Sequence, residues 1–216
     1  MSDDKHPPQT RETDPSIDFV DYLPRVFQAN ASRFYQSILA KVFEEIASPK
    51  AVQVEETSSI DEFLDRCAAL VDNHTANETA KAFALSLDGM FERQISRWIS
   101  GHRQHAKYLQ PALRVAERIG SFDAKAEAIA DDLGEMHLVA NVVRHGEGNA
   151  CKKLKVQAPH LFESSEPSYY DIAAGPVPTS EALRLGHDDV KRYTRAIVRF
   201  WGLADPLESA ELDPPF

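Results

Sequence analysis

The sequence predicts an all-α protein, a bundle of about six to seven helices with a long ordered loop before the last one. Apolar residues recur at spacings of three and four along most of the 216-residue chain, which gathers them on one side of a helix but scatters them on a strand. Prolines and glycines separate these periodic segments. Residues 51–55 alternate like a strand, but a single strand cannot form a sheet.

The first expected helices lie near the N-terminus, over residues 17–23 and 32–46. Pro24 and Pro49 are expected to end them, because proline lacks an amide hydrogen and its ring clashes with the preceding helical turn. Together the two segments predict a helical hairpin at the beginning of the fold.

A capping signal follows at Ser59, with Glu62 three residues later, ahead of another apolar run. In such a capping box the serine side chain accepts a hydrogen bond from an amide in the first turn of the helix. Asn77 is a second candidate N-cap, for a long helix that runs through Trp98. Two successive helices are therefore expected between Ser59 and Trp98.

The strongest helical periodicity begins at Phe122 and ends near Gly146. Ser121 is placed to cap the start of this helix, and Gly146 supplies the backbone freedom that a helix end needs. Its apolar residues recur in steps of four and three and predict one core stripe, made of Phe122, Ala126, Ile129, Leu133, Met136, Ala140 and Val143.

A proline-rich stretch and one more helix are expected towards the C-terminus. Residues 156–180 contain four prolines and no helical period, so we expect the long loop there, of a kind that often covers a functional surface. A final helix opens at His187 and places Tyr193 and Trp201 on an apolar face, with basic side chains on its back.

Length and composition favour one main domain. With 216 residues, 43% of them hydrophobic, the chain can bury one sizeable core. We predict a disordered tail over 1–15, a single helical domain over 16–204 and an acidic, proline-rich tail over 205–216. Within the domain, residues 16–75 would form the N-terminal helices and residues 76–204 the bundle that carries the site.

Charge, cysteine usage and hydropathy limit the partners and the compartment. A formal net charge of −10 argues against a surface that binds duplex DNA. Cys67 and Cys151 have no metal-binding spacing and are interpreted as buried thiols in a reducing compartment. No apolar run is long enough to span a bilayer, so no membrane partner is expected and a cytoplasmic location is predicted.

Sequence motifs for the common cofactor and metal chemistries are absent. The chain has no phosphate-binding glycine loop, no nucleophile elbow and no zinc-protease helix. His102 and His105 form one alternative metal pair, without a carboxylate at matching spacing. A second group fits a solvated acidic face better than a metal site and consists of Asp131, Asp132, Glu135 and His137. We therefore predict neither a metal nor a cofactor.

A polar seam lies at the end of the helix that was predicted to begin at Phe122. Four-residue steps place His137, Asn141 and His145 in one row, with Arg144 one turn on from Asn141. Cationic side chains suit the last turn of a helix, where carbonyl groups are free. Asn141 lies among apolar residues, and a buried amide without a partner costs about 1 to 3 kcal/mol, so we expect a dedicated partner for it. Helix-to-helix hydrogen bonding and a functional surface both explain the seam.

Asn141 followed four residues later by His145, near the end of an amphipathic helix in an all-helical domain, resembles the HEPN superfamily. The signature of that family is an arginine, usually followed by Asn, Asp or His, and then a histidine several residues further on. Asn141 and His145 match the polar and histidine positions, Ala140 stands where the arginine usually is, and Arg144 lies beside the histidine. Many family members are metal-independent ribonucleases of toxin–antitoxin, CRISPR and phage-defence systems.

The resemblance implies a metal-independent endoribonuclease or RNA-processing domain that works as a homodimer with a composite cleft. His145 would act as general base or acid on a ribose 2′-hydroxyl, Arg144 would stabilise the charged phosphorane, and Asn141 would orient the histidine or the phosphate. The backbone of single-stranded RNA would be held by Lys152, Lys153 and Lys155.

Two alternatives use the same residues without RNA cleavage. HEPN-like families include inactive members that serve as structural or binding modules, and Ala140 favours such a non-catalytic module, in which the seam binds a protein partner or a second copy. The other alternative is a small-molecule pocket inside the bundle, lined by Asn141 and His137.

Overall fold

A computed structural model describes residues 19–46, 59–162, 178–207 and 212–216. Within these residues the chain forms helices and no strand, which confirms the predicted all-α class. The helices are α1 (Phe19–Phe34), α2 (Ala40–Glu45), α3 (Ile60–Gly101), α4 (Leu109–Gly120), α5 (Ala130–His145), α6 (Asn149–Gln157) and α7 (His187–Ala204). The predicted tail over 1–15 and most of the predicted long loop lie outside the described residues.

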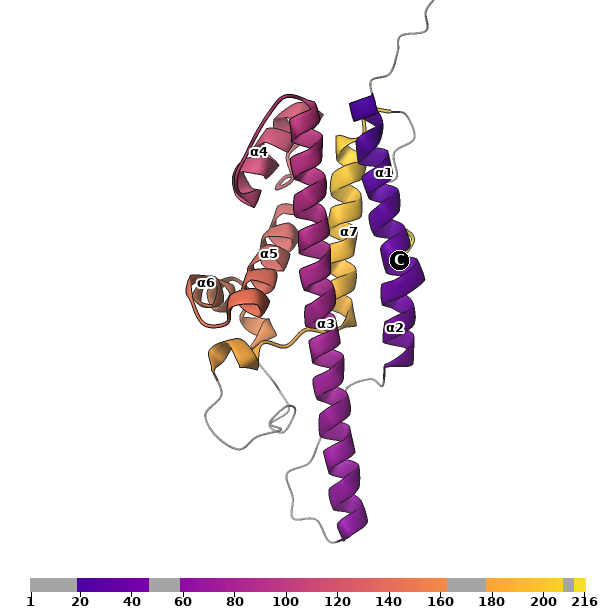
Figure 1. Cartoon of the computed structure of the whole chain (residues 1–216), viewed down its shortest axis with the longest axis vertical. Coiled ribbons are helices and arrows are strands. Elements are labelled where there is room, and N and C mark those ends of the chain that lie inside the picture. Colours follow the sequence, from indigo (N-terminus) through magenta and orange to yellow (C-terminus); the bar gives the residue numbers. More distant parts are fainter. Residues whose placement is uncertain (1–18, 47–58, 163–177, 208–211) are drawn as a thin grey trace, which may run out of the picture.

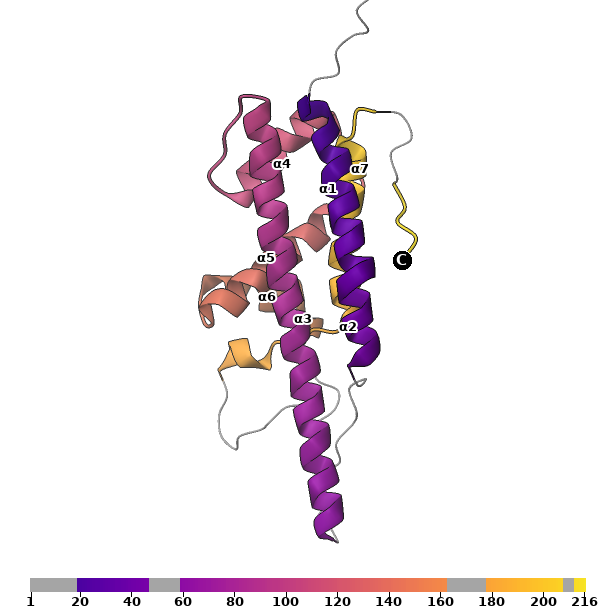
Figure 2. The ribbon, with the colours of Figure 1, turned by 45° about the vertical axis from the view of Figure 1, so that its right-hand side comes forward.

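The bundle is organised around α3, which has 42 residues. α1 packs along α7, and α3 packs along α5 (Figure 1). Turning the molecule shows that the N-terminal part of α3 projects beyond the other helices (Figure 2). None of residues 60–72 is buried, so this projecting part adds nothing to the core. The polar seam lies where α5 meets the middle of α3.

The first helices form one continuous rod instead of the expected hairpin. A π-helical turn, η1 (Tyr35–Leu39), joins α1 directly to α2. Pro24 does not end a helix but is buried inside α1, beside the buried Leu23 and Phe27. Proline inside a helix costs about 3 kcal/mol, and burial of neighbouring apolar side chains in the core offsets such a cost.

α3 begins where the capping signal predicted and continues through the second predicted start. The Ser59 hydroxyl accepts a hydrogen bond from the Glu62 amide at 3.2 Å. Asn77 is not an N-cap, because it lies inside α3 and is 2% exposed. Its side chain donates to the Leu183 carbonyl at 3.2 Å and accepts from the Leu185 amide at 2.9 Å. Asn77 therefore anchors the extended segment that leads into α7.

The helix predicted from Phe122 begins only at Ala130. Ser121 adopts a left-handed conformation, with φ of 56°, and ends α4 instead of capping α5. The loop that follows is held by carboxylates: Glu117 Oε1 accepts from the Ala124 amide at 3.1 Å, and Asp123 Oδ1 accepts from two further amides. These local hydrogen bonds satisfy the backbone without a helix, which helical periodicity does not take into account.

Aromatic residues from several helices form the centre of the core. Phe91 and Trp98 of α3 pack edge-on against Trp201 of α7, whose indole NH donates to Gln94 Oε1 at 3.0 Å. Part of the C-terminal segment also has a fixed place, because the Phe216 ring stacks on Tyr35 at 4.3 Å. No described helix is both long and apolar enough to cross a lipid bilayer.

Candidate functional site

A buried carboxylate, Asp88 of α3, lies at the centre of the polar seam. It is 0% exposed, and the core residues Leu87 and Phe91 flank it on the same helix. Asp88 Oδ1 lies 3.0 Å from His137 Nδ1, and Oδ2 lies 3.1 Å from an Arg144 guanidinium nitrogen. An unpaired buried carboxylate would be costly, so the two partners from α5 make its ionised form acceptable.

His137 links Asp88 to the predicted residue Asn141. Its Nε2 lies 3.1 Å from the Asn141 amide nitrogen, so Asn141 has the dedicated partner expected for it. With its proton on Nδ1, the neutral imidazole donates to Asp88 and accepts from Asn141. A protonated ring donates from both nitrogens, and Asn141 must then turn its amide oxygen towards Nε2. We call Asp88, His137, Asn141 and Arg144 the α3–α5 site.

The surroundings of His137 favour its protonated form. The hydrogen bond to Asp88 raises the pKa of His137 above its ordinary value of 6.5, and the Glu92 carboxylate, 3.7 Å away, acts in the same direction. Burial and the Arg144 charge oppose this increase but do not cancel it. His137 therefore takes up a proton, and with it a positive charge, more readily than an isolated histidine does.

Replacing Asp88 with asparagine is expected to lower the pKa of His137, measured by NMR titration of the imidazole resonances. Because the folded-state pKa of His137 is raised, its pairing with Asp88 contributes stability that is fully present below the unfolded pKa and is lost as pH rises through the folded pKa. The stability gap between the two proteins should therefore narrow as pH rises through the raised pKa of His137. Asp131→Asn, an exposed change on α5, is the control. An unchanged His137 titration in Asp88→Asn would refute the assignment.

Gly89 of α3 leaves room for two arginine side chains. A Cβ atom at Gly89 would lie 3.2 Å from a guanidinium nitrogen of Arg93 and 3.8 Å from one of Arg144. The two guanidinium groups therefore approach the same position beside Gly89. The Arg144 side chain is 30% exposed, so the group that contacts buried Asp88 also reaches solvent.

The remaining residues of the predicted motif lie on different sides of α5. His145 is exposed at the end of the helix, and no described residue forms a hydrogen bond or ion pair with it. Ala140 is 0% exposed and faces the core, where an arginine would bury its charge. Arg144, one turn later, instead brings a guanidinium to Asp88. Gly146 follows with φ of 66° and ends α5.

The three predicted RNA-binding lysines lie on α6, a helix that the sequence did not predict. α6 packs on α5 and turns Cys151 and Leu154 inward. Three lysines are exposed on its surface, namely Lys152, Lys153 and Lys155. Two buried side chains are too few for the periodicity to be recognised in advance.

Within the acidic group expected to be solvated, Asp131 is exposed as expected, but Glu135 and His137 face two different interfaces. Glu135 is 7% exposed and faces α7, where it accepts hydrogen bonds from the Tyr193 hydroxyl at 2.7 Å and from Arg192. Burial and the nearby Glu135 charge raise the pKa of Tyr193, so its hydroxyl keeps the proton that it donates. His137 faces α3, and the two residues therefore do not form the alternative metal site.

Among the described residues, two groups of side chains have ligand atoms within 4.8 Å of one another, close enough for a divalent cation. They are Asp88, Glu92 and His137, and Glu135, His160 and Asp189. A cation in the first group would compete with the Arg144 guanidinium for Asp88. In the second, Glu135 is already held by Arg192 and Tyr193. In both groups, side chains of the protein already supply the carboxylate with the positive charge or hydrogen bonds that a metal cation would otherwise provide.

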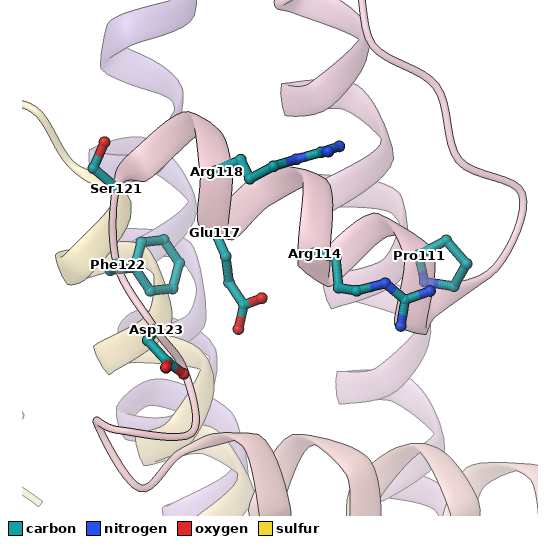
Figure 3. A pocket seen from close by; sticks show the side chains of 7 residues that line it. All are labelled: Pro111, Arg114, Glu117, Arg118, Ser121, Phe122 and Asp123. Carbon is teal, nitrogen blue, oxygen red and sulfur yellow. The ribbon is translucent and has the colours of Figure 1, made fainter.

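A hollow of about 680 Å³ lies beside α4 and the loop that follows it. Figure 3 shows Glu117 on α4 and Asp123 on the loop, with Arg118 extending away along the helix. Both carboxylates accept hydrogen bonds from backbone amides of the loop. The two carboxylates of this hollow therefore hold the loop in place. The α3–α5 site, which combines a buried carboxylate with a histidine and an arginine, has the stronger functional chemistry.

The sequence did not indicate Asp88 of the α3–α5 site, nor Glu92 beside His137. Asp88 precedes His137 by 49 residues and lies on another helix, so no local motif joins them. One signal was present: a carboxylate beside Leu87 and near Phe91, within the apolar pattern of a core helix. A charge in that position needs a partner from elsewhere in the fold.

Comparisons of the chain with protein-family models, with curated proteins and with solved structures find no match. Its function therefore has to be inferred from the side chains of the site and their surroundings.

Proposed function

We propose that this protein cuts single-stranded RNA without a metal ion, as a HEPN-like endoribonuclease or RNA-processing domain. The supporting observation is that buried Asp88 holds Arg144 and His137 at the surface of one helical interface. A fixed cation near the scissile phosphate can stabilise charge that develops in the transition state. His145, which is exposed, directly follows Arg144 in α5.

Each side chain has a distinct task in the proposed reaction. His145 removes the proton from a ribose 2′-hydroxyl, whose oxygen attacks the adjacent phosphorus. Arg144 stabilises the negative charge of the phosphorane. The bond between phosphorus and the 5′ oxygen then breaks, and that oxygen takes up a proton from water, which leaves a 2′,3′-cyclic phosphate. Asp88 and His137 position Arg144, and Asn141 holds His137.

The proposal includes a homodimer and a role in a toxin–antitoxin or phage-defence system. In the HEPN-like arrangement the seams of two copies face each other, so that Arg144 and His145 of both line one cleft. Both side chains reach solvent, which such pairing requires. The α6 lysines then hold the RNA backbone beside the cleft.

The direct test is an assay with purified protein and a labelled single-stranded RNA in excess EDTA. We expect cleavage and products that end in a 2′,3′-cyclic phosphate. A DNA strand of the same sequence should stay intact, because it lacks the attacking 2′-hydroxyl. Intact RNA would refute the proposal, and cleavage that EDTA abolishes would replace it with a metal-dependent reaction.

A non-catalytic interaction module is the second candidate, and the projecting part of α3 favours it. Ile60, Leu64 and Val71 are 68%, 56% and 56% exposed, and steps of four and three through Cys67 place them along one face. Such an exposed apolar stripe is typical of a helix that pairs with another. This candidate predicts intact RNA and a dimer mass by light scattering that Leu64→Glu reduces to that of the monomer.

A further inference from the structure

A groove of about 580 Å³ lies between α3 and the continuous rod of α1, η1 and α2. It is on the other side of α3 from the α3–α5 site. Its polar lining comes from Asn30, Arg33 and Ser37 on one side and from Ser86 and Arg93 on the other. No carboxylate from the described parts of the chain lines it. The hollows beside α4 and α7 differ, because their linings include Asp123 and Asp132, respectively.

The two groove arginines carry charge that the described residues do not neutralise. Arg25, Arg144 and Arg195 each form an ion pair. Arg33 and Arg93 are exposed, and neither forms an ion pair or hydrogen bond within the described parts of the chain. In a chain with a formal net charge of −10, two such arginines facing one groove indicate a site for an anion.

The groove also offers apolar surface between the two charges. Phe34, Ile38 and Met90 contribute to its lining, and Ile38 is 47% exposed. The π-helical turn η1 contains Ser37 and Ile38, and π-helical turns are frequent at functional sites. Arginine beside aromatic and apolar side chains suits a nucleic acid strand, because phosphates pair with arginine while unpaired bases stack on the apolar surface.

Gly89 connects the groove with the α3–α5 site. Arg93 lines the groove, and its guanidinium and that of Arg144 approach the same position beside Gly89. Arg93 therefore joins the groove, which Arg33 also lines, to Arg144 of the α3–α5 site. Because Gly89 has no side chain of its own, these two guanidinium groups can lie close together between the groove and the α3–α5 site.

We propose that this groove binds single-stranded RNA next to the segment that is cut, with Arg33 and Arg93 contacting consecutive parts of its backbone. That the bound strand is RNA rests on the proposed function, whereas the anionic, base-bearing character of the ligand follows from the groove lining. The groove determines affinity for the flanking strand, whereas His145 and Arg144 of α5 perform the chemistry.

The test measures binding of a fluorescein-labelled single-stranded RNA by anisotropy in EDTA, with His145→Ala as the background that prevents cleavage. Arg33→Glu and Arg93→Glu should each raise Kd about tenfold or more. Arg118→Glu, the same charge reversal at an exposed site on α4, should not. For Arg33→Gln and Arg93→Gln, the slope of log K against log salt concentration should fall by about 0.7 per lost phosphate contact.

Equal Kd values for the groove variants and Arg118→Glu would overturn this inference, as would absence of RNA binding. Melting curves check that each variant is folded. The results distinguish a failure of the proposed cleavage from a failure of the proposed groove. If the wild-type protein binds RNA through the groove but does not cut it, only the proposed cleavage is refuted. If it cuts RNA and the groove variants keep the wild-type KM and Kd, only the proposed role of the groove is refuted.

Discussion

His145→Ala should reduce the rate of RNA cleavage by about 10²- to 10⁴-fold, the usual contribution of a general acid or base. The melting temperature and helical circular dichroism should change little, because the ring is exposed and no described residue bonds to it. Its interaction with the carbonyl end of α5 is worth about 1 kcal/mol at most. Initial rates with single-stranded RNA in EDTA, together with melting curves, measure both effects.

His105→Ala is the matched control for this experiment. His105 is also exposed, but it lies in the connection between α3 and α4, at the other end of the bundle (Figure 1). This variant should cut RNA at the wild-type rate. If His145→Ala retains full activity while His137→Ala is inactive, the acid–base role belongs to the histidine that Asp88 holds.

Arg192→Met should lower the free energy of unfolding by about 3 kcal/mol, because it breaks the ion pair with Glu135. This value is at the low end of the cost of breaking a buried ion pair, since the Arg192 side chain is 34% exposed. The change leaves the Glu135 carboxylate, 7% exposed, with the Tyr193 hydroxyl but without its cation. For a chain of this length the melting temperature should fall by roughly 6 to 12 °C. Calorimetry at pH 7 measures this fall in the melting temperature.

Two further variants separate loss of the ion pair from loss of side-chain packing. Lys191→Met removes a neighbouring charge on α7 that no described residue pairs with, and it should change stability by less than about 0.5 kcal/mol. Glu135→Leu combined with Arg192→Met removes both charges, so the double variant should be more stable than Arg192→Met alone. Equal stability of the single and double variants would mean that the Glu135 charge is not the cause.

Helix positions could be predicted where the determining forces are local. Ser59 begins α3 and His187 begins α7 as expected, since capping and periodicity depend on nearby residues. The predictions were wrong at Pro24 and Asn77, which look like boundaries but lie inside helices. In both cases contacts with distant segments outweigh the local preference for a helix end.

The site could be predicted only on one of its two helices. The polar residues of α5 were recognised because they interrupt a regular apolar pattern, and the need of Asn141 for a partner followed from the cost of burying an amide. That the partner is His137, and that His137 is held in turn by Asp88, depends on how α3 packs against α5.

The helical fold and the polar side chains near the end of α5 follow from amino-acid order alone, because periodicity and capping act over a few residues. Tertiary packing places Asp88 beside His137 and Arg144, buries Ala140 and brings Arg93 and Arg144 together beside Gly89. The charge and hydrogen bonding of a side chain depend on which segments surround it. Those neighbours are far away in sequence and meet only when the helices pack.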